Sequence, residues 1–164
     1  MITQKITPCL WFDSEAEDAA KLYTSIFKNS SIGDISRYGK EGFEFHHKAP
    51  GTAMVVSFTL DGQAFTALNG GPIFKFNEAI SLQVYCESQA EIDSYWEKLS
   101  QGGDPKAQQC GWLKDKYGLS WQVVPDSMDQ FFKDHTSPKT ERAMMAMLEM
   151  KKIDLEKLKR AYEG

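Results

Sequence analysis

The hydrophobic residues in the first part of the chain follow strand and helix patterns in turn. Residues 6–12 form an aromatic-rich run, and the apolar residues between 16 and 27 recur at spacings of three and four. Asp61-Gly62, a dipeptide typical of a two-residue hairpin turn, joins the last two of three alternating runs, at 31–38, 53–60 and 63–69. The pattern predicts a strand, a helix and three strands over 6–70.

The same succession begins again after Gly70-Gly71-Pro72, which interrupts both kinds of pattern. Residues 79–86 form a second strand pattern. A second helical stripe follows and stops at Gly102-Gly103; its apolar residues are Ile92, Tyr95, Trp96 and Leu99. A hairpin pattern at 110–125 comes next, with apolar and aromatic residues on both sides of a charged turn.

Two pairs of matching motifs indicate an internal repeat. Ser14-Glu15-Ala16-Glu17 and Ser88-Gln89-Ala90-Glu91 both have the form of a capping box, in which serine and glutamate satisfy backbone donors at a helix start. They lie 88 − 14 = 74 positions apart, and the hairpin glycines Gly62 and Gly118 lie 118 − 62 = 56 positions apart. A doubled unit predicts two similar modules, whose pairing is obligatory because so short a sheet cannot bury both faces alone.

The sequence thus predicts paired modules over 1–125, namely 6–70 and 79–125, followed by a helical extension at 126–164. Ser137-Pro138 indicates a helix with proline at its first position, and Asp154 caps a shorter helix. Methionines recur at helical spacing in the first of these helices. They indicate adaptable packing against the body of the chain or a second subunit, with a peptide-binding groove as the alternative.

Two glutamines on predicted strands are the most unusual polar residues. Gln122 lies in a run of tryptophan and valine, and a buried amide needs partners for two donors and an acceptor. Gln83 lies in the strand pattern at 79–86. Either the two amides contact a ligand, or they bond each other across the interface between the modules.

Composition and charge narrow the class of protein. Hydrophobic residues make up 41% of the chain and charged residues 26%, as in ordinary globular proteins. A net charge of −4 with interspersed signs argues against nucleic-acid and anionic-membrane partners. Three cysteines without CxxC spacing argue against a disulfide framework and a structural zinc site. Because neither a leader nor a membrane-spanning run is evident, we expect a soluble cytoplasmic protein.

Four motifs resemble those of one known family: Phe76-Asn77-Glu78-Ala79-Ile80-Ser81, Cys110-Gly111-Trp112-Leu113-Lys114-Asp115, Gly118-Leu119-Ser120-Trp121-Gln122-Val123-Val124-Pro125 and Met150-Lys151-Lys152-Ile153-Asp154. Together they are similar to the PhnB-like branch of the vicinal oxygen chelate superfamily, which includes glyoxalase I, bleomycin-resistance proteins and extradiol dioxygenases. The resemblance covers nearly the whole chain. It implies an α+β fold of two paired βαβββ modules with a C-terminal helical tail, and a homodimer in which the curved sheets enclose a cleft.

The resemblance also implies where a metal ion would bind. Glyoxalase-like members hold a divalent metal with His and Glu from the first and last strands of each module. Read through the repeat, these places fall on Cys9 and Gln83 in the first strands and on Thr66 and Gln122 in the last. Two amides, a hydroxyl and a thiol suit neither oxygen-preferring ions nor zinc. We therefore expect no metal at this site.

Many members of this branch carry the label 3-demethylubiquinone-9 3-methyltransferase. A Rossmann-like site for an adenosyl cofactor requires a glycine-rich turn between a strand and a helix. Gly70-Gly71-Pro72 follows a strand pattern but opens no helix pattern. The residues therefore predict no cofactor, and no pattern in them supports the methyl transfer that the label describes.

The leading hypothesis is a metal-free protein that binds a small, partly aromatic or apolar molecule in the cleft between the modules. The predicted ligand-binding residues are Cys9, Trp11, Thr66, Gln83, Trp112, Trp121 and Gln122. A glyoxalase- or dioxygenase-type enzyme is one alternative; it needs further metal ligands, and His46 and His47 are the imidazoles near mid-chain. A methyltransferase is the other. The sequence assigns no catalytic residue.

Overall fold

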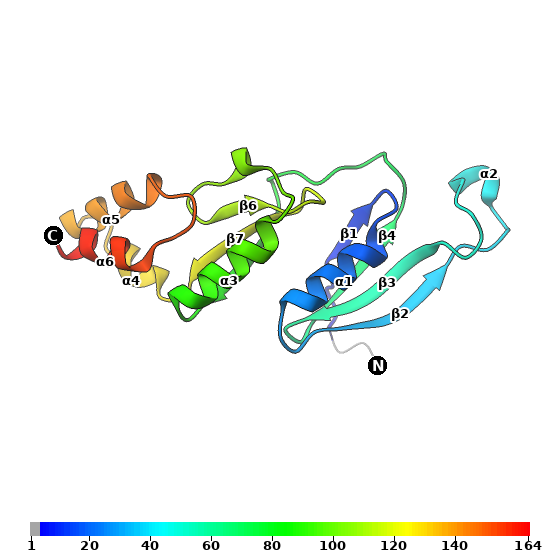
Figure 1. Ribbon diagram of the computed structural model, residues 1–164, viewed down its shortest axis with the longest axis horizontal. Helices are drawn as coiled ribbons and strands as arrows, with labels where there is room; N and C mark the ends of the chain where they lie inside the picture. Colours follow the sequence, from blue (N-terminus) through cyan, green and yellow to red (C-terminus); the bar gives the residue numbers. More distant parts are fainter. Residues whose placement is uncertain (1–3) are drawn as a thin grey trace. The chain divides into compact units, whose positions relative to one another are not determined.

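The computed structural model describes residues 4–164, which form two compact units (Figure 1). Unit 1 ends at Phe76, and unit 2 covers Asn77–Gly164. The elements of unit 1 are β1 (Cys9–Phe12), α1 (Ala16–Ile26), β2 (Ser31–Arg37), α2 (Phe43–His46), β3 (Ala53–Leu60) and β4 (Gln63–Asn69). Those of unit 2 are β5 (Leu82–Cys86), α3 (Gln89–Ser100), the 3-10 turn η1 (Pro105–Ala107), β6 (Trp112–Lys114), β7 (Ser120–Pro125), α4 (Met128–Phe132), α5 (Pro138–Leu148) and α6 (Leu155–Glu163). Among the described residues, no helix is long and apolar enough to cross a membrane.

Unit 1 is a four-stranded sheet with one helix against it. The strand order is β1-β4-β3-β2, in which β1 is parallel to β4 and the other pairs are antiparallel. α1 packs on one face, where the rings of Tyr23 and Phe58 lie 6.5 Å apart between centroids. Because side chains alternate along a strand, the residues between those of the core lie on the other face, which we call the open face of unit 1.

Unit 2 has a three-stranded sheet, ordered β5-β7-β6, with α3 on one face. β5 is parallel to β7, and β6 and β7 form the predicted hairpin. The core face carries Leu113, Trp121 and Val123, and the opposite face is the open face of unit 2. The predicted α+β class is confirmed. The second sheet has one strand fewer than a βαβββ module, because the polar segment at 101–109, interrupted by Gly102, Gly103 and Pro105, forms η1 instead of a strand.

The internal repeat extends to the pairing of individual residues. In unit 1, Cys9 of β1 lies opposite Thr66 of β4. In unit 2, Gln83 of β5 lies opposite Gln122 of β7. Each pair joins the first and last strands of its sheet, which run parallel to each other. The offset of 74 positions relates Cys9 to Gln83, and the offset of 56 positions relates Thr66 to Gln122, so the two pairs are equivalent. The repeat is therefore structural, not a coincidence of common motifs.

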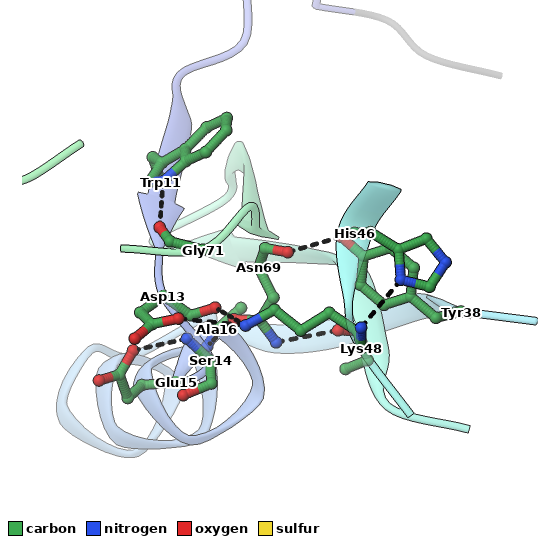
Figure 2. Close-up of polar contacts among 11 residues, drawn as sticks. Trp11, Asp13, Ser14, Glu15, Ala16, Tyr38, His46, Lys48, Asn69 and Gly71 are labelled. Atoms are coloured by element: carbon green, nitrogen blue, oxygen red, sulfur yellow. Dashed lines mark hydrogen bonds and ion pairs between the residues drawn. The ribbon is translucent and has the colours of Figure 1, made fainter. Parts of the chain in front are cut away.

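The two predicted capping boxes differ in outcome. Ser88 Oγ accepts a hydrogen bond from the Glu91 N–H at 3.3 Å, so the serine of the second box caps α3 as predicted. The first prediction is wrong, because the Ser14 side chain does not cap α1. Instead, Oδ1 of the buried Asn69 accepts the bond from Ala16 N–H at 2.8 Å (Figure 2). A residue from β4 thereby replaces the local cap.

The tail is helical and packs on unit 2. The predicted caps at Ser137 and Asp154 are confirmed, since their side chains accept bonds from the N–H groups of Lys139 and Lys157. α4 was not predicted. The three tail helices share a core cluster made of Phe131, Ala143, Met150, Ile153 and Leu158. The segment between α5 and α6 adds two backbone hydrogen bonds to the start of the hairpin, from Cys110 N–H to Met150 O at 2.8 Å and from Gly111 N–H to Lys151 O at 2.7 Å.

Candidate functional site

A chain of four hydrogen-bonded side chains lies on the open face of unit 2. Tyr85 Oη donates to Gln83 Oε1 at 2.9 Å. Gln83 Nε2 donates to Gln122 Oε1 at 3.4 Å, and Gln122 Nε2 donates to Ser81 Oγ at 2.8 Å. We call Ser81, Gln83, Tyr85 and Gln122 the amide chain. Ser81 and Tyr85 lie two residues on either side of Gln83, so period-two alternation could have identified both from the sequence.

The amide pair is partly as expected. Gln83 and Gln122 bond each other, but the prediction that they do so across two modules is wrong, because both belong to the sheet of unit 2. Their 3.4 Å separation exceeds the usual 2.7–3.2 Å range for N–H···O bonds, so this is the weakest bond of the chain. Tyr85 is 62% exposed, and the amide chain is accessible from solution in unit 2.

Charge on this face is balanced. Lys114, at the end of β6, forms an ion pair with Glu78, and this contact lowers the pKa of the Glu78 carboxyl below its usual value. Ser120, opposite Lys114 in the hairpin, is 1% exposed, and its hydroxyl has no hydrogen-bond partner among residues 4–164. Ser120 and Gln122 point to the same face because they are two positions apart on β7. An unpaired hydroxyl beside a polar chain is the kind of group that a ligand satisfies.

The tryptophans of the predicted site take different places. Trp112 lies opposite Gln122 in the hairpin register and is half-buried, so its indole borders the amide chain. Trp121 lies on the other face of the sheet, 2% exposed in the core, and its Nε1–H donates to Asp115 Oδ2 at 2.9 Å. The structure therefore groups Trp112 with Gln83 and Gln122 and separates Trp121 from them.

The open face of unit 1 presents smaller groups in the equivalent places. A row of thiol and hydroxyl side chains crosses it, since Cys9 pairs with Thr66 and Thr66 pairs with Ser57. Trp11, two residues after Cys9, donates from Nε1 to Gly71 O at 2.8 Å (Figure 2) and packs edge-on against Phe74 with centroids 5.0 Å apart. The predicted residues of unit 1 thus share one face.

The mid-chain histidines belong to a polar loop structure. His46 Nδ1 accepts a bond from the Lys48 N–H at 3.0 Å, and the His46 ring stacks on Tyr38 with centroids 4.4 Å apart. Lys48 Nζ in turn donates to Asp13 O at 2.7 Å and pairs with the Asp13 carboxylate at 3.1 Å (Figure 2). His46 is therefore engaged in holding the loop between β2 and β3, which gives it a structural role.

The tail contains a pocket of about 440 Å³ lined by His135, Thr140, Glu141, Met144 and Met145. The methionines of α5 differ in how far they are buried. Met147 packs against the tail core, as the packing interpretation predicts, whereas Met144 and Met145 are exposed.

The three cysteines differ in accessibility, and Cys86 makes a testable case. Cys9 is exposed, Cys110 is half-buried, and Cys86 is buried. Burial, with smaller contributions from the charges of Glu91 and Asp126, raises the pKa of the Cys86 thiol from 9.0 to about 12.

Because the folded protein keeps the Cys86 proton while the unfolded chain loses it, stability should fall between pH 9.0 and about 12. The thiol contributes a slope of at most about 1.4 kcal/mol per pH unit to the free energy of unfolding. Urea unfolding of the wild type and of Cys86→Ala at pH 8 and pH 10.5 measures this contribution. Equal pH slopes for the two proteins would contradict it.

The donor chemistry does not fit a divalent metal at the places that the superfamily uses. Cys9, Thr66, Gln83 and Gln122 provide two neutral amides, a hydroxyl and a thiol, and the amides already bond each other. No group of three or more His, Cys, Asp or Glu residues within the described part of the chain could hold a metal ion.

The strand-to-helix turns do not fit an adenosyl cofactor of the Rossmann type. The turn from β1 to α1 is Asp13-Ser14-Glu15, and the turn from β5 to α3 is Glu87-Ser88. Neither contains the glycines that let a backbone approach a nucleotide closely, and neither sheet is a doubly wound parallel sheet.

The family model and a solved structure that match this chain carry the same family name. A family model described as 3-demethylubiquinone-9 3-methyltransferase matches residues 4–124. A solved protein from Bacillus cereus, described as "Putative 3-demethylubiquinone-9 3-methyltransferase, PhnB protein", is 41% identical to this chain. That match covers 74% of this chain and 99% of the other, with a TM-score of 0.64. No curated protein matches at a significant level.

More distant structures share the fold. Protein PA1353 from Pseudomonas aeruginosa is 18% identical, covering 76% of this chain and 100% of that one, with a TM-score of 0.56. The fosfomycin resistance protein FosX from Listeria monocytogenes, in its monoclinic form at pH 6.5, is 15% identical, covering 82% and 100%, with a TM-score of 0.51. The family match ends before α4, so the tail lies outside it. The chain belongs to the PhnB-like family described as 3-demethylubiquinone-9 3-methyltransferase.

Proposed function

We propose that this chain is a metal-free protein that binds a small molecule on the open faces of its sheets. The observation that carries the proposal is the amide chain, which concentrates neutral hydrogen-bonding groups on the face of unit 2. Gln83 and Tyr85 are exposed and Ser81 and Gln122 half-buried, and a small number of placed polar groups is what fixes the orientation of a ligand in a binding site. The accessible Tyr85 hydroxyl and the half-buried Trp112 offer further polar and aromatic surface.

Unit 1 carries a second set of candidate ligand-binding groups on its own open face. Cys9 and Thr66 occupy the places equivalent to Gln83 and Gln122, and Trp11 adds an aromatic surface held in place by its bond to Gly71. The homodimer and the shared cleft implied by the resemblance, and the cytoplasmic location expected from the sequence, are part of the same proposal. Trp121 has an indirect role in it, since it supports the hairpin from the core.

Elemental analysis of protein purified without chelators, together with native mass spectrometry, tests this proposal. We expect a dimer mass, no stoichiometric metal, and a small molecule that remains bound under gentle conditions. One tightly held metal ion per subunit would overturn the proposal and direct attention to glyoxalase- and dioxygenase-type assays. Calorimetric binding of an adenosyl cofactor would instead support methyl transfer.

Replacing Gln122 by leucine is expected to abolish retention of the small molecule while the protein stays folded. Gln122 makes two side-chain hydrogen bonds, to Ser81 and with Gln83, and it is only half-buried. The loss in the free energy of unfolding should therefore be about 1 kcal/mol. Native mass spectrometry measures retention, and urea unfolding measures stability.

The matched control for Gln122→Leu is Gln63→Leu, at the exposed start of β4. This control variant should keep both the retained molecule and the wild-type stability. If Gln122→Leu lowered the free energy of unfolding by several kcal/mol, the amide pair would serve to stabilise the fold and the proposed binding role would be wrong.

A further inference from the structure

The free hydrogen-bonding groups of the amide chain indicate what kind of ligand would fit it. A carboxamide has two N–H donors and an oxygen with two lone pairs. Gln83 uses one donor on Gln122 and one lone pair on Tyr85, and Gln122 uses one donor on Ser81 and one lone pair on Gln83. Each glutamine therefore retains one N–H and one lone pair, so that donors and acceptors lie next to each other on adjacent strands.

The ends of the amide chain are hydroxyls, which can donate or accept. Ser81 accepts from Gln122 and keeps its own hydrogen, while Tyr85 donates to Gln83 and keeps its lone pairs. The unpartnered Ser120 hydroxyl adds another group of this kind on the same face. All of these groups are neutral, and the ammonium group of Lys114 on this face is paired with Glu78.

We propose that the open face of unit 2 selects a neutral, planar ligand whose edge carries an N–H donor beside a carbonyl acceptor, as in a carboxamide, a urea or a lactam ring. Such an edge enters at the 3.4 Å contact between Gln83 and Gln122, the bond that is easiest to open, and replaces it with two bonds. A hydrogen bond from the ligand to Ser120 would also satisfy a buried hydroxyl. The inference rests on the proposed function, because it assigns a ligand class to the same face.

The same geometry disfavours charged ligands. A carboxylate would find the Lys114 ammonium already paired with Glu78, and an amidinium would find the Glu78 carboxylate occupied in the same way. Either charge would lose hydration without gaining a partner. The indole of Trp112, opposite Gln122, provides an apolar surface for the ring that carries the amide edge.

Four matched probes test the ligand class: benzamide, N,N-dimethylbenzamide, benzoate and benzamidine. Each is titrated into the full-length protein labelled with nitrogen-15, and the side-chain amide signals of Gln83 and Gln122 report binding at the site. These signals are assigned from their absence in Gln83→Leu and Gln122→Leu. We expect benzamide to shift both signals, and the probe without an N–H donor to bind about tenfold more weakly. Benzoate and benzamidine should cause no saturable shift.

The two glutamine variants and one control variant complete the experiment. Gln83→Leu and Gln122→Leu should each weaken benzamide binding about tenfold, while Gln63→Leu leaves it unchanged. Gln83→Leu keeps the test available if Gln122→Leu does not fold.

The outcomes separate this inference from the proposed function. If benzoate, benzamidine or N,N-dimethylbenzamide shifted the two signals as strongly as benzamide, the ligand class would be wrong while binding at this face would stand. If no probe shifted them but the purified protein retained a small molecule, the ligand class would again be wrong. If no probe shifted them and no molecule were retained, the proposed function itself would fail.

Discussion

Asp115→Ala is expected to lower the free energy of unfolding by about 4 kcal/mol, because three donors around this buried carboxylate lose their acceptor at once. Asp115 is 3% exposed and follows β6 directly. Its Oδ1 accepts from the N–H groups of Tyr117 and Leu119, at 2.9 and 3.1 Å, and its Oδ2 accepts from Trp121 Nε1. The carboxylate therefore fixes both the turn of the hairpin and the tryptophan in the core.

Urea unfolding followed by tryptophan fluorescence measures the effect. Lys116→Ala is the matched control, since Lys116 is the exposed neighbour in the same turn, and it should change stability by less than about 0.5 kcal/mol. The loss of stability for Asp115→Asn should lie between those for Asp115→Ala and Lys116→Ala. The amide keeps one acceptor oxygen, but its NH2 group points a donor towards other donors. An Asp115→Ala protein as stable as the control would show that the carboxylate does not organise the hairpin.

Asn69→Leu is expected to cost about 3 kcal/mol of stability, because it leaves a donor and an acceptor unpaired inside unit 1. Asn69 is 1% exposed; it accepts from Ala16 N–H at 2.8 Å and donates from Nδ2 to Ala53 O at 2.9 Å. Leucine is similar in size, so packing changes little and the loss reports the hydrogen bonds. Chemical denaturation compares the variant with the wild type.

Ser14→Ala is the control for Asn69→Leu, and it separates two accounts of how α1 begins. A serine that caps a helix contributes about 1 kcal/mol, whereas the structure gives Ser14 no capping bond. We therefore expect Ser14→Ala to be nearly neutral. A loss for Ser14→Ala equal to that for Asn69→Leu would mean that the local cap, and not Asn69, holds the helix start.

Local patterns in the sequence were sufficient for most of the fold. The boundaries of β3 and β4 agree with the predicted runs, and both residues of the turn Asp61-Gly62 have the positive φ angles of a two-residue hairpin. The two offsets of the repeat matched Cys9 with Gln83 and Thr66 with Gln122 between the units, but the pairing of Cys9 with Thr66 and of Gln83 with Gln122 within each sheet was not predicted. Strand alternation and turn chemistry are properties of neighbouring residues, so they can be read along the chain.

Contacts between distant residues could not be predicted in this way. The first capping box has the right residue types, but the helix start is held instead by Asn69, 53 positions after Ala16, which accepts from the Ala16 N–H. Alternation along the strand does place Trp121 on the opposite face from Gln122, but the sequence did not show that Trp112 lies opposite Gln122, since the register of the hairpin decides which residues pair. Asp115 was likewise overlooked, because a charged residue in a predicted turn is normally exposed.

The two backbone bonds from Cys110 and Gly111 to Met150 and Lys151 have a consequence for the order of folding. All strands of unit 1 are complete at Asn69, so its sheet can assemble early while the ribosome is still adding unit 2. The N–H groups of Cys110 and Gly111, at the start of the hairpin of unit 2, instead gain their acceptors only 150 − 110 = 40 residues later. We therefore expect this end of the hairpin to become ordered last, when the segment between α5 and α6 has left the ribosome.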